Sequence, residues 1–452
     1  MKSRSIMVVS LFLTFVMLSA AACSSAPAGN ASATSGPIVI GYVGAMNSPG
    51  TRPCMDIMQM ACDDINAAGG ILGRNIRLSI EDGKGETSQS VAAVQRLLMR
   101  DRPVNYFIEG RSEIALAIKE KSADLYPAYP HIATANGAAD WEVTEGIVSE
   151  YDRYKFFFRD FEFAQYSWQY NLPAQIMKNI MHIKKVAILY EDLVWTTVYR
   201  TGGGPCKMPS ARKYLESQGF EVVYEKPIKP RAGMWLPALE AIAAAKADVI
   251  YVYSSWYTDV EVLAKQWADS SARDIPIMAG GGTISTQQFW DMTGGKCLGM
   301  MTELWDDDTI PVTPTLIPLV KKARAAGIPL QYHVIAAYND VFGLKYNMEQ
   351  AKTTTDVEAL IKQFESGVPW EGITGPAAFN SKRVEPWFHS GQVANIDNPL
   401  EVVYPDKFHT PWNQWQGKGN LPLLITWPGF IKYAHPEAYR TPAELRAAAA
   451  SK

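Results

Sequence analysis

The chain has 452 residues, of which 47% are hydrophobic and 20% are charged, an ordinary composition for a globular protein of two or more domains. Its formal net charge is −3, and no lysine and arginine cluster stands out along the chain. This charge pattern argues against a surface that binds nucleic acid, so no nucleic-acid partner is expected.

The N-terminus has the pattern of an export signal. Lys2 and Arg4 precede an apolar stretch over residues 6–18, and small residues lead up to Cys23. We predict a signal peptide over residues 1–22 and a lipid anchor on Cys23, as in bacterial lipoproteins; plain secretion is the alternative. The small polar residues that follow predict a flexible tether over residues 23–36. The expected location is the periplasm or the cell surface, at a membrane.

The next elements are a strand, a helix and a second strand. Residues 38–46 are almost continuously apolar, as in a strand covered on both faces of a parallel sheet. Apolar residues then recur at intervals of three and four, which gives a helix one apolar face: Met55, Met58, Cys62 and Ile65. Gly69 and Gly70 end this helix, and alternating apolar residues over 76–81 predict a half-buried strand.

Strands and helices continue to alternate along the chain. The predicted strands lie near residues 104–110, 131–140, 185–192, 220–227, 247–255 and 275–281. The predicted helices lie near residues 91–100, 114–126, 209–219, 235–246, 259–271, 316–327, 331–351 and 356–367. A repeated strand–helix unit predicts an α/β fold with parallel sheets covered by helices. Strand and loop segments follow from residue 372, before a short alanine-rich helix at the end.

Four further cysteines lie in a compartment that permits disulfides: Cys54, Cys62, Cys206 and Cys297. Cys54 and Cys62 are eight residues apart on one predicted helix, too far to bridge each other directly. The sequence leaves the pairing of the others open.

Several segments together resemble the branched-chain amino acid (Leu/Ile/Val) binding family of type I periplasmic binding proteins, which serve ABC transporters. They are "YVGAMNSPG" (42–50), "DINAAGGILG" (64–73), "GRSEIALA" (110–117), "KVAILYED" (185–192) and "GITGPAAFN" (372–380). The resemblance covers nearly all of residues 37–395 and implies two lobes, each a parallel sheet flanked by helices. It implies three hinge crossings, near residues 160–164, 295–302 and 372–380. Lobe 1 would comprise residues 37–162 and 298–374, and lobe 2 residues 163–297 and 375–452.

The resemblance also implies a ligand site between the lobes, at the carboxyl ends of the strands. The corresponding positions in the first lobe are Arg111, Ser112, Ala135, Asn136 and Gly137. Those in the second lobe are Trp195, Tyr253, Trp256, Tyr257 and Gly281. Any of the tryptophans could instead pack in the core, and Arg111 could instead pair with Glu109 or another carboxylate.

The predicted ligand is a small organic acid. Amino acid binders of this family place an acidic residue against the ligand ammonium, and its position here falls at about Gly281, which has no carboxylate. Because a buried ammonium without a countercharge is costly, an α-amino acid is disfavoured. Arg111 suits a carboxylate, and aromatic faces suit a planar or apolar body. A small amide or urea-like compound is the next candidate.

The chain has no recognisable catalytic or metal-binding motif. The six histidines include no H-x-x-x-H pair, and neither C-x-x-C nor G-x-S-x-G occurs. We therefore predict no enzyme, no metal and no cofactor. The expected function is that of a substrate-binding lipoprotein of an ABC importer, with the permease subunits as partners. A ligand-sensing receptor on the same fold is the alternative.

Overall fold

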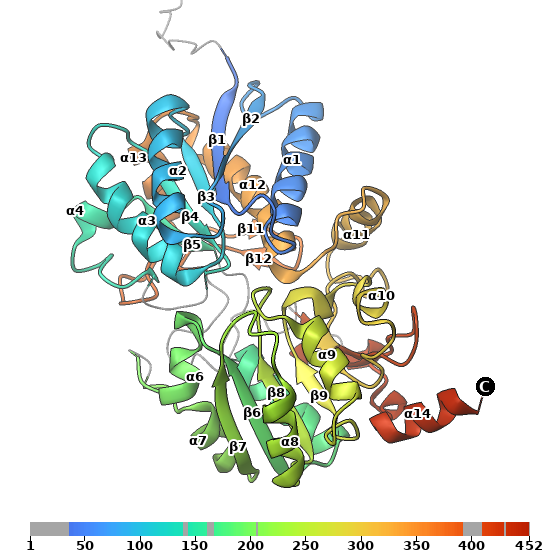
Figure 1. Ribbon diagram of the computed structural model, residues 1–452. Coiled ribbons are helices and arrows are strands. Elements are labelled where there is room, and N and C mark those ends of the chain that lie inside the picture. Colours follow the sequence, from blue (N-terminus) through green and yellow to red (C-terminus); the bar gives the residue numbers. More distant parts are fainter. Residues whose placement is uncertain are drawn as a thin grey trace, which may run out of the picture. The chain divides into compact units, whose positions relative to one another are not determined.

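The computed structural model describes residues 36–138, 143–160, 167–204, 207–391, 409–428 and 431–451. The predicted signal peptide, Cys23 and Cys206 lie outside the described residues. Within the described part, the chain forms two main sheets, and each sheet is the centre of one lobe (Figure 1).

The first lobe is built on a five-stranded parallel sheet with the order β2-β1-β3-β4-β5. Its strands are β1 (Ile38–Gly44), β2 (Ile76–Asp82), β3 (Asn105–Ile108), β4 (Ile132–Asn136) and β5 (Phe157–Asp160). Six of the seven residues of β1 are buried, as expected for an apolar strand covered on both faces. The sequence predicted β1 to β4 but not β5.

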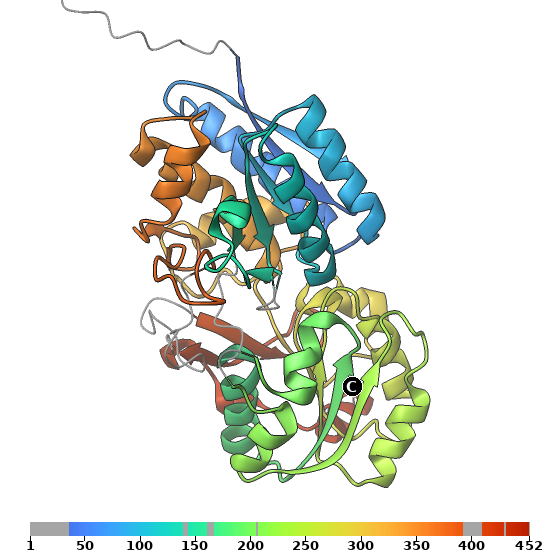
Figure 2. The same cartoon turned by 90° about the vertical axis from the view of Figure 1, so that its left-hand side faces the viewer.

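Helices from two distant parts of the chain surround this sheet (Figure 2). The first group consists of α1 (Arg52–Ala67), α2 (Thr87–Arg100), α3 (Ser112–Leu125) and α4 (Tyr151–Tyr154). The second group consists of α11 (Leu316–Ala325), α12 (Tyr332–Ala351) and α13 (Val357–Phe364). Apolar side chains of both groups belong to one buried cluster with the sheet. The first lobe is therefore discontinuous in sequence.

The end of α1 has the predicted form. The four residues of the predicted apolar face are all buried, and the helix ends at Ala67. Gly69 and Gly70 both have positive φ angles, of 102° and 76°. The amide of Gly70 then donates to the carbonyl of Ile65 (2.8 Å), and Ile71 is fully buried. The two glycines allow the chain to fold back onto its own helix.

Replacing Gly70 with alanine is expected to destabilise the protein more than the same change at Gly69. Both positions carry the strain of a left-handed backbone, but a methyl group at Gly70 would overlap the backbone carbonyl of Arg74. A methyl group at Gly69 meets no atom within 4 Å. We expect Gly69→Ala to cost about 1 kcal/mol and Gly70→Ala to cost about 3 kcal/mol. Urea denaturation measures both, and equal losses would contradict the steric explanation.

The second lobe is built on a seven-stranded mixed sheet with the order β14-β13-β10-β9-β8-β6-β7. Its strands are β6 (Lys185–Glu191), β7 (Glu221–Ile228), β8 (Val249–Tyr253), β9 (Ile277–Ala279), β10 (Met301–Glu303), β13 (His409–Gln414) and β14 (Leu423–Pro428). The strands β6 to β9 are parallel, as predicted, and β10, which was not predicted, pairs with β9 in the same direction. The last two strands are antiparallel, because β14 follows β13 after a short connection rather than after a helix.

Short helices flank this second sheet. They are α5 (Leu172–Gln175), α6 (Thr197–Thr201), α7 (Ala211–Ser217), α8 (Leu236–Ala244), α9 (Val260–Ala268) and α10 (Phe289–Thr293). The last helix, α14 (Pro442–Ala450), projects away from the sheet (Figure 1). One face of the sheet packs with α8 and α9 in a separate buried cluster that includes Trp235, Trp267 and Trp415. Cys297 lies in this cluster, and it is a free thiol, as are Cys54 and Cys62 in the first lobe.

The structure shows how segments beside the second and third predicted crossings, near residues 295–302 and 372–380, are packed. β10 pairs with β9 and β13, so residues 301–303 belong to the second sheet although the predicted boundary fell at residue 297. The short hairpin of β11 (Trp370–Glu371) and β12 (Pro376–Ala377) follows α13. Residues beyond it still pack on the first lobe, where the Phe379 ring stacks on Phe364 and the Arg159 guanidinium donates to Ser390 Oγ. The complete division into lobes stays a prediction.

Candidate ligand-binding site

A cavity of about 490 Å³ is lined by residues of both lobes. The first lobe contributes the loop after β1, the loop after β2, and Arg111 at the start of α3. The second lobe contributes Leu193, Pro230, Arg231 and Tyr257. All these segments follow the carboxyl ends of parallel strands, where open α/β sheets bind their ligands. The cavity is therefore the candidate site.

Arg111 is held in this cavity by three contacts. Its Nη1 donates to the carbonyl oxygen of Gly85 (2.8 Å), and its guanidinium lies 5.3 Å from the centre of the Tyr257 ring. Its Nε lies 3.6 Å from Glu113 Oε2, so the ion pair is with Glu113 and not with Glu109. Since Tyr257 belongs to the second lobe, the arginine and its aromatic platform come from opposite lobes.

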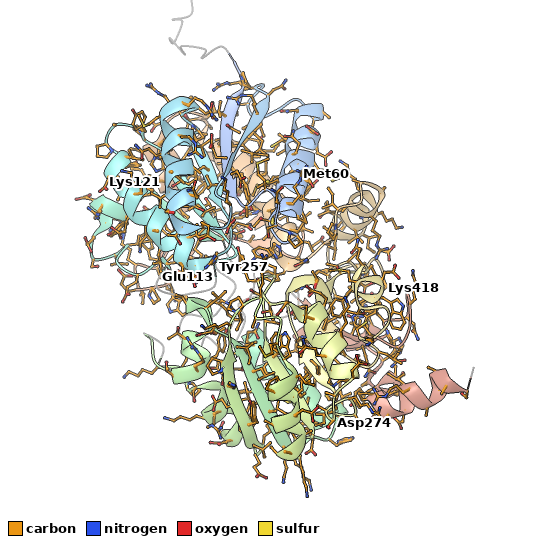
Figure 3. All side chains as sticks on the ribbon, in the orientation of Figure 1. Met60, Glu113, Lys121, Tyr257, Asp274 and Lys418 are labelled. Carbon is orange, nitrogen blue, oxygen red and sulfur yellow. The ribbon has the colours of Figure 1, made fainter. Side chains whose placement is uncertain are left out.

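Tyr257 also joins the lobes through a hydrogen bond. Its hydroxyl donates to Glu109 Oε1 (2.9 Å), and the Ala45 amide donates to the other carboxylate oxygen (2.7 Å). Glu109 lies just beyond β3 and is fully buried. Burial raises the pKa of this carboxyl group, and the two hydrogen bonds oppose that rise. The Glu113 carboxylate makes a second link, because it accepts from the Val194 amide of the second lobe (3.1 Å). Figure 3 labels Glu113 and Tyr257 close to each other where the two lobes meet.

Replacing Tyr257 with phenylalanine is expected to destabilise the protein more at pH 8 than at pH 5. The ring under Arg111 is retained, but the buried Glu109 carboxylate loses one of its two donors, which costs about 1–3 kcal/mol when it is ionised. Losing that donor raises the pKa of Glu109 further, so the penalty disappears as the group becomes protonated at lower pH. Urea denaturation at the two pH values measures this difference. In a Glu109→Gln background, the effect of Tyr257→Phe should no longer depend on pH.

The other predicted residues of the first lobe lie outside the cavity lining. Ser112 is buried as the first residue of α3, and Ala135 is buried near the end of β4. The Asn136 side-chain amide donates to Asp340 Oδ2 of α12 (2.6 Å). Gly137 follows with a φ angle of 71°, and its amide donates to the Asp160 carbonyl (2.9 Å). These strand-end residues therefore contact α12 and β5 within their own lobe.

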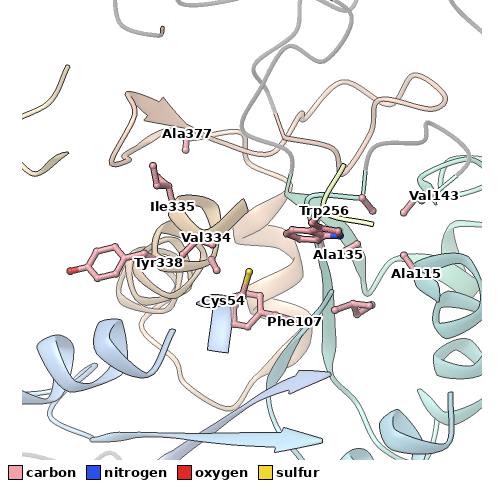
Figure 4. Close-up of a cluster of buried hydrophobic side chains, with 14 of the residues drawn as sticks. Cys54, Phe107, Ala115, Ala135, Val143, Trp256, Val334, Ile335, Tyr338 and Ala377 are labelled. Atoms are coloured by element: carbon pink, nitrogen blue, oxygen red, sulfur yellow. The ribbon is translucent and has the colours of Figure 1, made fainter. Parts of the chain in front are cut away.

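The aromatic residues of the second lobe separate into three environments. Tyr253 is 1% exposed and stacks on Tyr190 in the core of its lobe. The Trp195 indole donates to Glu191 Oε2 (2.9 Å). Trp256 reaches the first lobe, where its ring meets Gly50 and His333 and joins the buried cluster around Cys54 and Val334 (Figure 4). Of the ten predicted ligand positions, only Arg111 and Tyr257 line the described cavity, and their role stays a prediction.

Gly281 has a carboxylate beside it that the sequence analysis missed. Its amide donates to Glu303 Oε1 (2.6 Å), and Glu303 is fully buried on β10. An amino acid ligand was disfavoured because residue 281 itself has no carboxylate, but the Glu303 carboxylate lies against its backbone amide. Glu303 lies 22 residues further along, on a strand of only three residues, so nothing in the local sequence connects it to Gly281.

Glu191 is a second buried carboxylate at the carboxyl end of a strand in this lobe. It accepts hydrogen bonds from the Ser255 hydroxyl (2.6 Å), the Thr258 hydroxyl (2.9 Å) and the Trp195 indole. Burial raises its pKa to about 7, against the effect of these three donors. The contacts tie the loops after β6 and β8 together, which fixes the segment that carries Tyr257.

Among the residues that the structure describes, no cluster of three or more histidine, cysteine or acidic side chains could hold a metal ion. Within the same ranges, no helix combines the length and the apolar character of a membrane span. Three consecutive acidic residues, 306–308, lie beside Arg324, whose guanidinium pairs with Asp306 (2.5 Å) and Asp308 (3.1 Å). The cavity itself contains a cationic group, Arg111, which lies beside Tyr257 of the other lobe. This arrangement can hold an anionic solute between the two lobes.

Two α/β lobes with strand-end loops around a shared cavity define a two-lobed solute-binding protein of type I. The chain belongs to the periplasmic binding protein family, whose model matches residues 37–396. Two curated relatives have names of Leu/Ile/Val-binding proteins, the group that the sequence resembles. Leu/Ile/Val-binding protein homolog 3 of Brucella melitensis is 22% identical over 360 residues, which are 79% of this chain and 90% of the relative. Leu/Ile/Val-binding protein BraC3 of Rhizobium johnstonii is 24% identical over 68% of this chain and 77% of the relative.

Solved structures share the fold. An ABC transporter substrate-binding protein from Sphaerobacter thermophilus is 19% identical, with a TM-score of 0.64 over 87% of this chain and 98% of that one. A solute-binding protein from Rhodopseudomonas palustris, solved with p-hydroxybenzoic acid, is 18% identical, with a TM-score of 0.65 over 86% of this chain and 97% of that one. The family and the fold are those of binding proteins.

Proposed function

We propose that the protein is the substrate-binding component of an ABC importer and captures a small organic carboxylate between its lobes. The observation that carries this proposal is the position of Arg111 of one lobe against Tyr257 of the other, in a cavity that both lobes line. Under this proposal, the protein is a lipoprotein anchored through Cys23 at the periplasmic or cell surface and passes its solute to permease subunits.

The chemistry of the cavity supports a carboxylate ligand. A guanidinium presents donors in a planar fork that matches the two oxygens of a carboxylate. Arg111 is pre-oriented by Gly85 and Tyr257, so binding loses little side-chain freedom. A volume of about 490 Å³ lies within the range of small-molecule sites. The Rhodopseudomonas palustris protein, solved with p-hydroxybenzoic acid, is a precedent for a carboxylate ligand on this fold.

An α-amino acid is a second candidate, favoured by Glu303. This carboxylate lies at the Gly281 amide, the position at which amino acid binders of the family place their acidic residue. A structure of the same fold from Streptococcus pneumoniae was solved in complex with isoleucine. Glu303 does not line the described cavity, so an ammonium would have to reach a neighbouring region. The carboxylate of an amino acid would still need a partner such as Arg111.

A thermal-shift screen of carboxylates, amides and amino acids tests the proposal. A ligand at 100 times its dissociation constant adds roughly 2.7 kcal/mol to the free energy of unfolding. We expect carboxylates to raise the melting temperature of the wild-type protein but not that of an Arg111→Met variant. Shifts with amides alone, or carboxylate shifts that survive Arg111→Met, would overturn the proposal. Solute uptake by vesicles that contain the permease separates an importer from a ligand-sensing receptor.

A further inference from the structure

Two further cations line the cavity, one from each lobe. Lys84 lies in the loop between β2 and α2, and Arg231 lies in the loop between β7 and α8. Both side chains are exposed. Within the described ranges, no carboxylate forms an ion pair with either of them. Together with Arg111, they place three cationic groups around one cavity.

The lining also contains two acidic residues, Asp82 and Glu86. Asp82 Oδ1 accepts from the amides of Met46 (3.2 Å) and Lys84 (2.9 Å). Glu86 immediately precedes α2 and makes no side-chain hydrogen bond to the helix N-terminus. Within the described lining, Lys84 and Arg231 therefore outnumber Glu86, the acidic residue that the backbone does not engage, and leave a positive charge for a ligand to neutralise.

The backbone at both cations has an uncommon conformation. Lys84 has a φ angle of 54° and Arg231 one of 52°, a left-handed region that residues other than glycine seldom adopt. Each such residue costs free energy unless its surroundings fix it. Both loops thus hold a cationic residue in a left-handed conformation at the edge of the same cavity, a conformation that surface residues away from the cavity such as Lys246 also adopt.

We infer that the preferred ligand is a dicarboxylate. One carboxylate binds Arg111, and the second binds between Lys84 and Arg231. This inference rests on the proposed function, because it assumes that Arg111 takes a carboxylate. Cations from opposite lobes would make the second carboxylate a bridge between the lobes. Its charge is then neutralised only when both lobes surround the ligand, so a dicarboxylate favours the closed arrangement more than a monocarboxylate does.

Isothermal titration of the full chain with matched acids tests the inference. The pairs are butyrate with succinate, valerate with glutarate, and hexanoate with adipate, each differing only in the second carboxylate. We expect at least one diacid to bind about 10-fold more tightly than its monoacid, and more weakly as salt is added. Lys84→Gln and Arg231→Gln should each remove most of this preference, because they weaken diacid binding far more than monoacid binding. Lys229→Gln, an exposed residue outside the lining, is the matched control and should change neither.

The outcomes separate the inference from the proposed function. Equal affinities within every pair, with Arg111→Met weakening both acids, would overturn the dicarboxylate inference and leave the proposed function standing. A diacid preference that survives both Lys84→Gln and Arg231→Gln would also overturn it. If no acid of any pair binds, the proposed function fails as well. Melting temperatures of the variants, measured without ligand, verify that each one is folded.

Discussion

Replacing Gly50 with alanine is expected to push the two lobes apart and to weaken ligand binding by roughly 10- to 100-fold, without unfolding either lobe. A methyl group at Gly50 would lie 2.6 Å from Trp256 Cγ and 2.7 Å from Cδ2. Gly50 is not among the residues with a positive φ angle, so its backbone accepts alanine. The overlap therefore arises only where the first lobe meets the second, and overpacking of this kind costs about 1–3 kcal/mol.

Trp256 has little room to move away from such a methyl group. Its indole is 8% exposed, meets the His333 ring edge-on, and lies parallel to the Tyr332 ring, 6.5 Å away. Small-angle scattering should show a larger radius of gyration for Gly50→Ala, and titration should show the weaker binding. Trp256→Ala removes the overlapping ring, so the Gly50→Ala and Trp256→Ala double variant should bind no worse than Trp256→Ala alone. A full additional loss in the double variant would exclude the overlap as the cause.

The fold could be predicted from the sequence where apolar residues recur over several helical turns or run through a whole strand. The apolar face of α1 and the buried run of β1 are such segments. β10 has only three residues and shows no pattern of its own, so its place in the second sheet could not be foreseen. The antiparallel pair of β13 and β14 was equally hidden, since pairing direction depends on a connection and not on the strands themselves.

The site could be predicted only in part, because strand-end position does not fix where a side chain points. Arg111 and Tyr257 were found through that rule and line the cavity. Tyr253 obeys the same rule but is the last residue of β8 and points into the core. Glu109 lies just beyond β3 and Glu303 ends β10, both without any motif, and their contacts in the site are with partners 148 and 22 residues away in the chain.

Asp160→Asn is expected to stabilise the protein above neutral pH and to flatten the decline of its stability with rising pH. Asp160 ends β5 beside Asn136 of β4, and its side chain forms a hydrogen bond with Asp340 of α12. Both acids are nearly fully buried. Burial raises the pKa of Asp160 well above its usual value, and the nearby Asp340 carboxyl adds to the rise; Arg159 opposes it. The folded protein therefore holds a proton here that the unfolded chain releases near pH 4.

The sign of the pH dependence follows from this proton. Because the folded pKa exceeds the unfolded one, the contribution to stability is complete below about pH 4 and is lost as the pH rises through the folded value. Each unit of difference corresponds to about 1.4 kcal/mol. Asparagine keeps a donor toward Asp340 and cannot ionise, so we expect a gain of at least about 1 kcal/mol at pH 8 and little change at pH 4.

Urea denaturation between pH 4 and pH 8 measures this effect against two references. Asp152→Asn removes an exposed carboxyl group of α4 and should leave the slope of the parent protein unchanged. Glu109 and Glu191 also have raised pKa values, so a reduced slope of the same sign should remain in Asp160→Asn. If Asp160→Asn keeps the full slope of the parent, the Asp160 and Asp340 carboxyls do not share a proton in the folded protein. If it instead unfolds more readily at pH 8, the ionised form of Asp160 is the one that the first lobe requires.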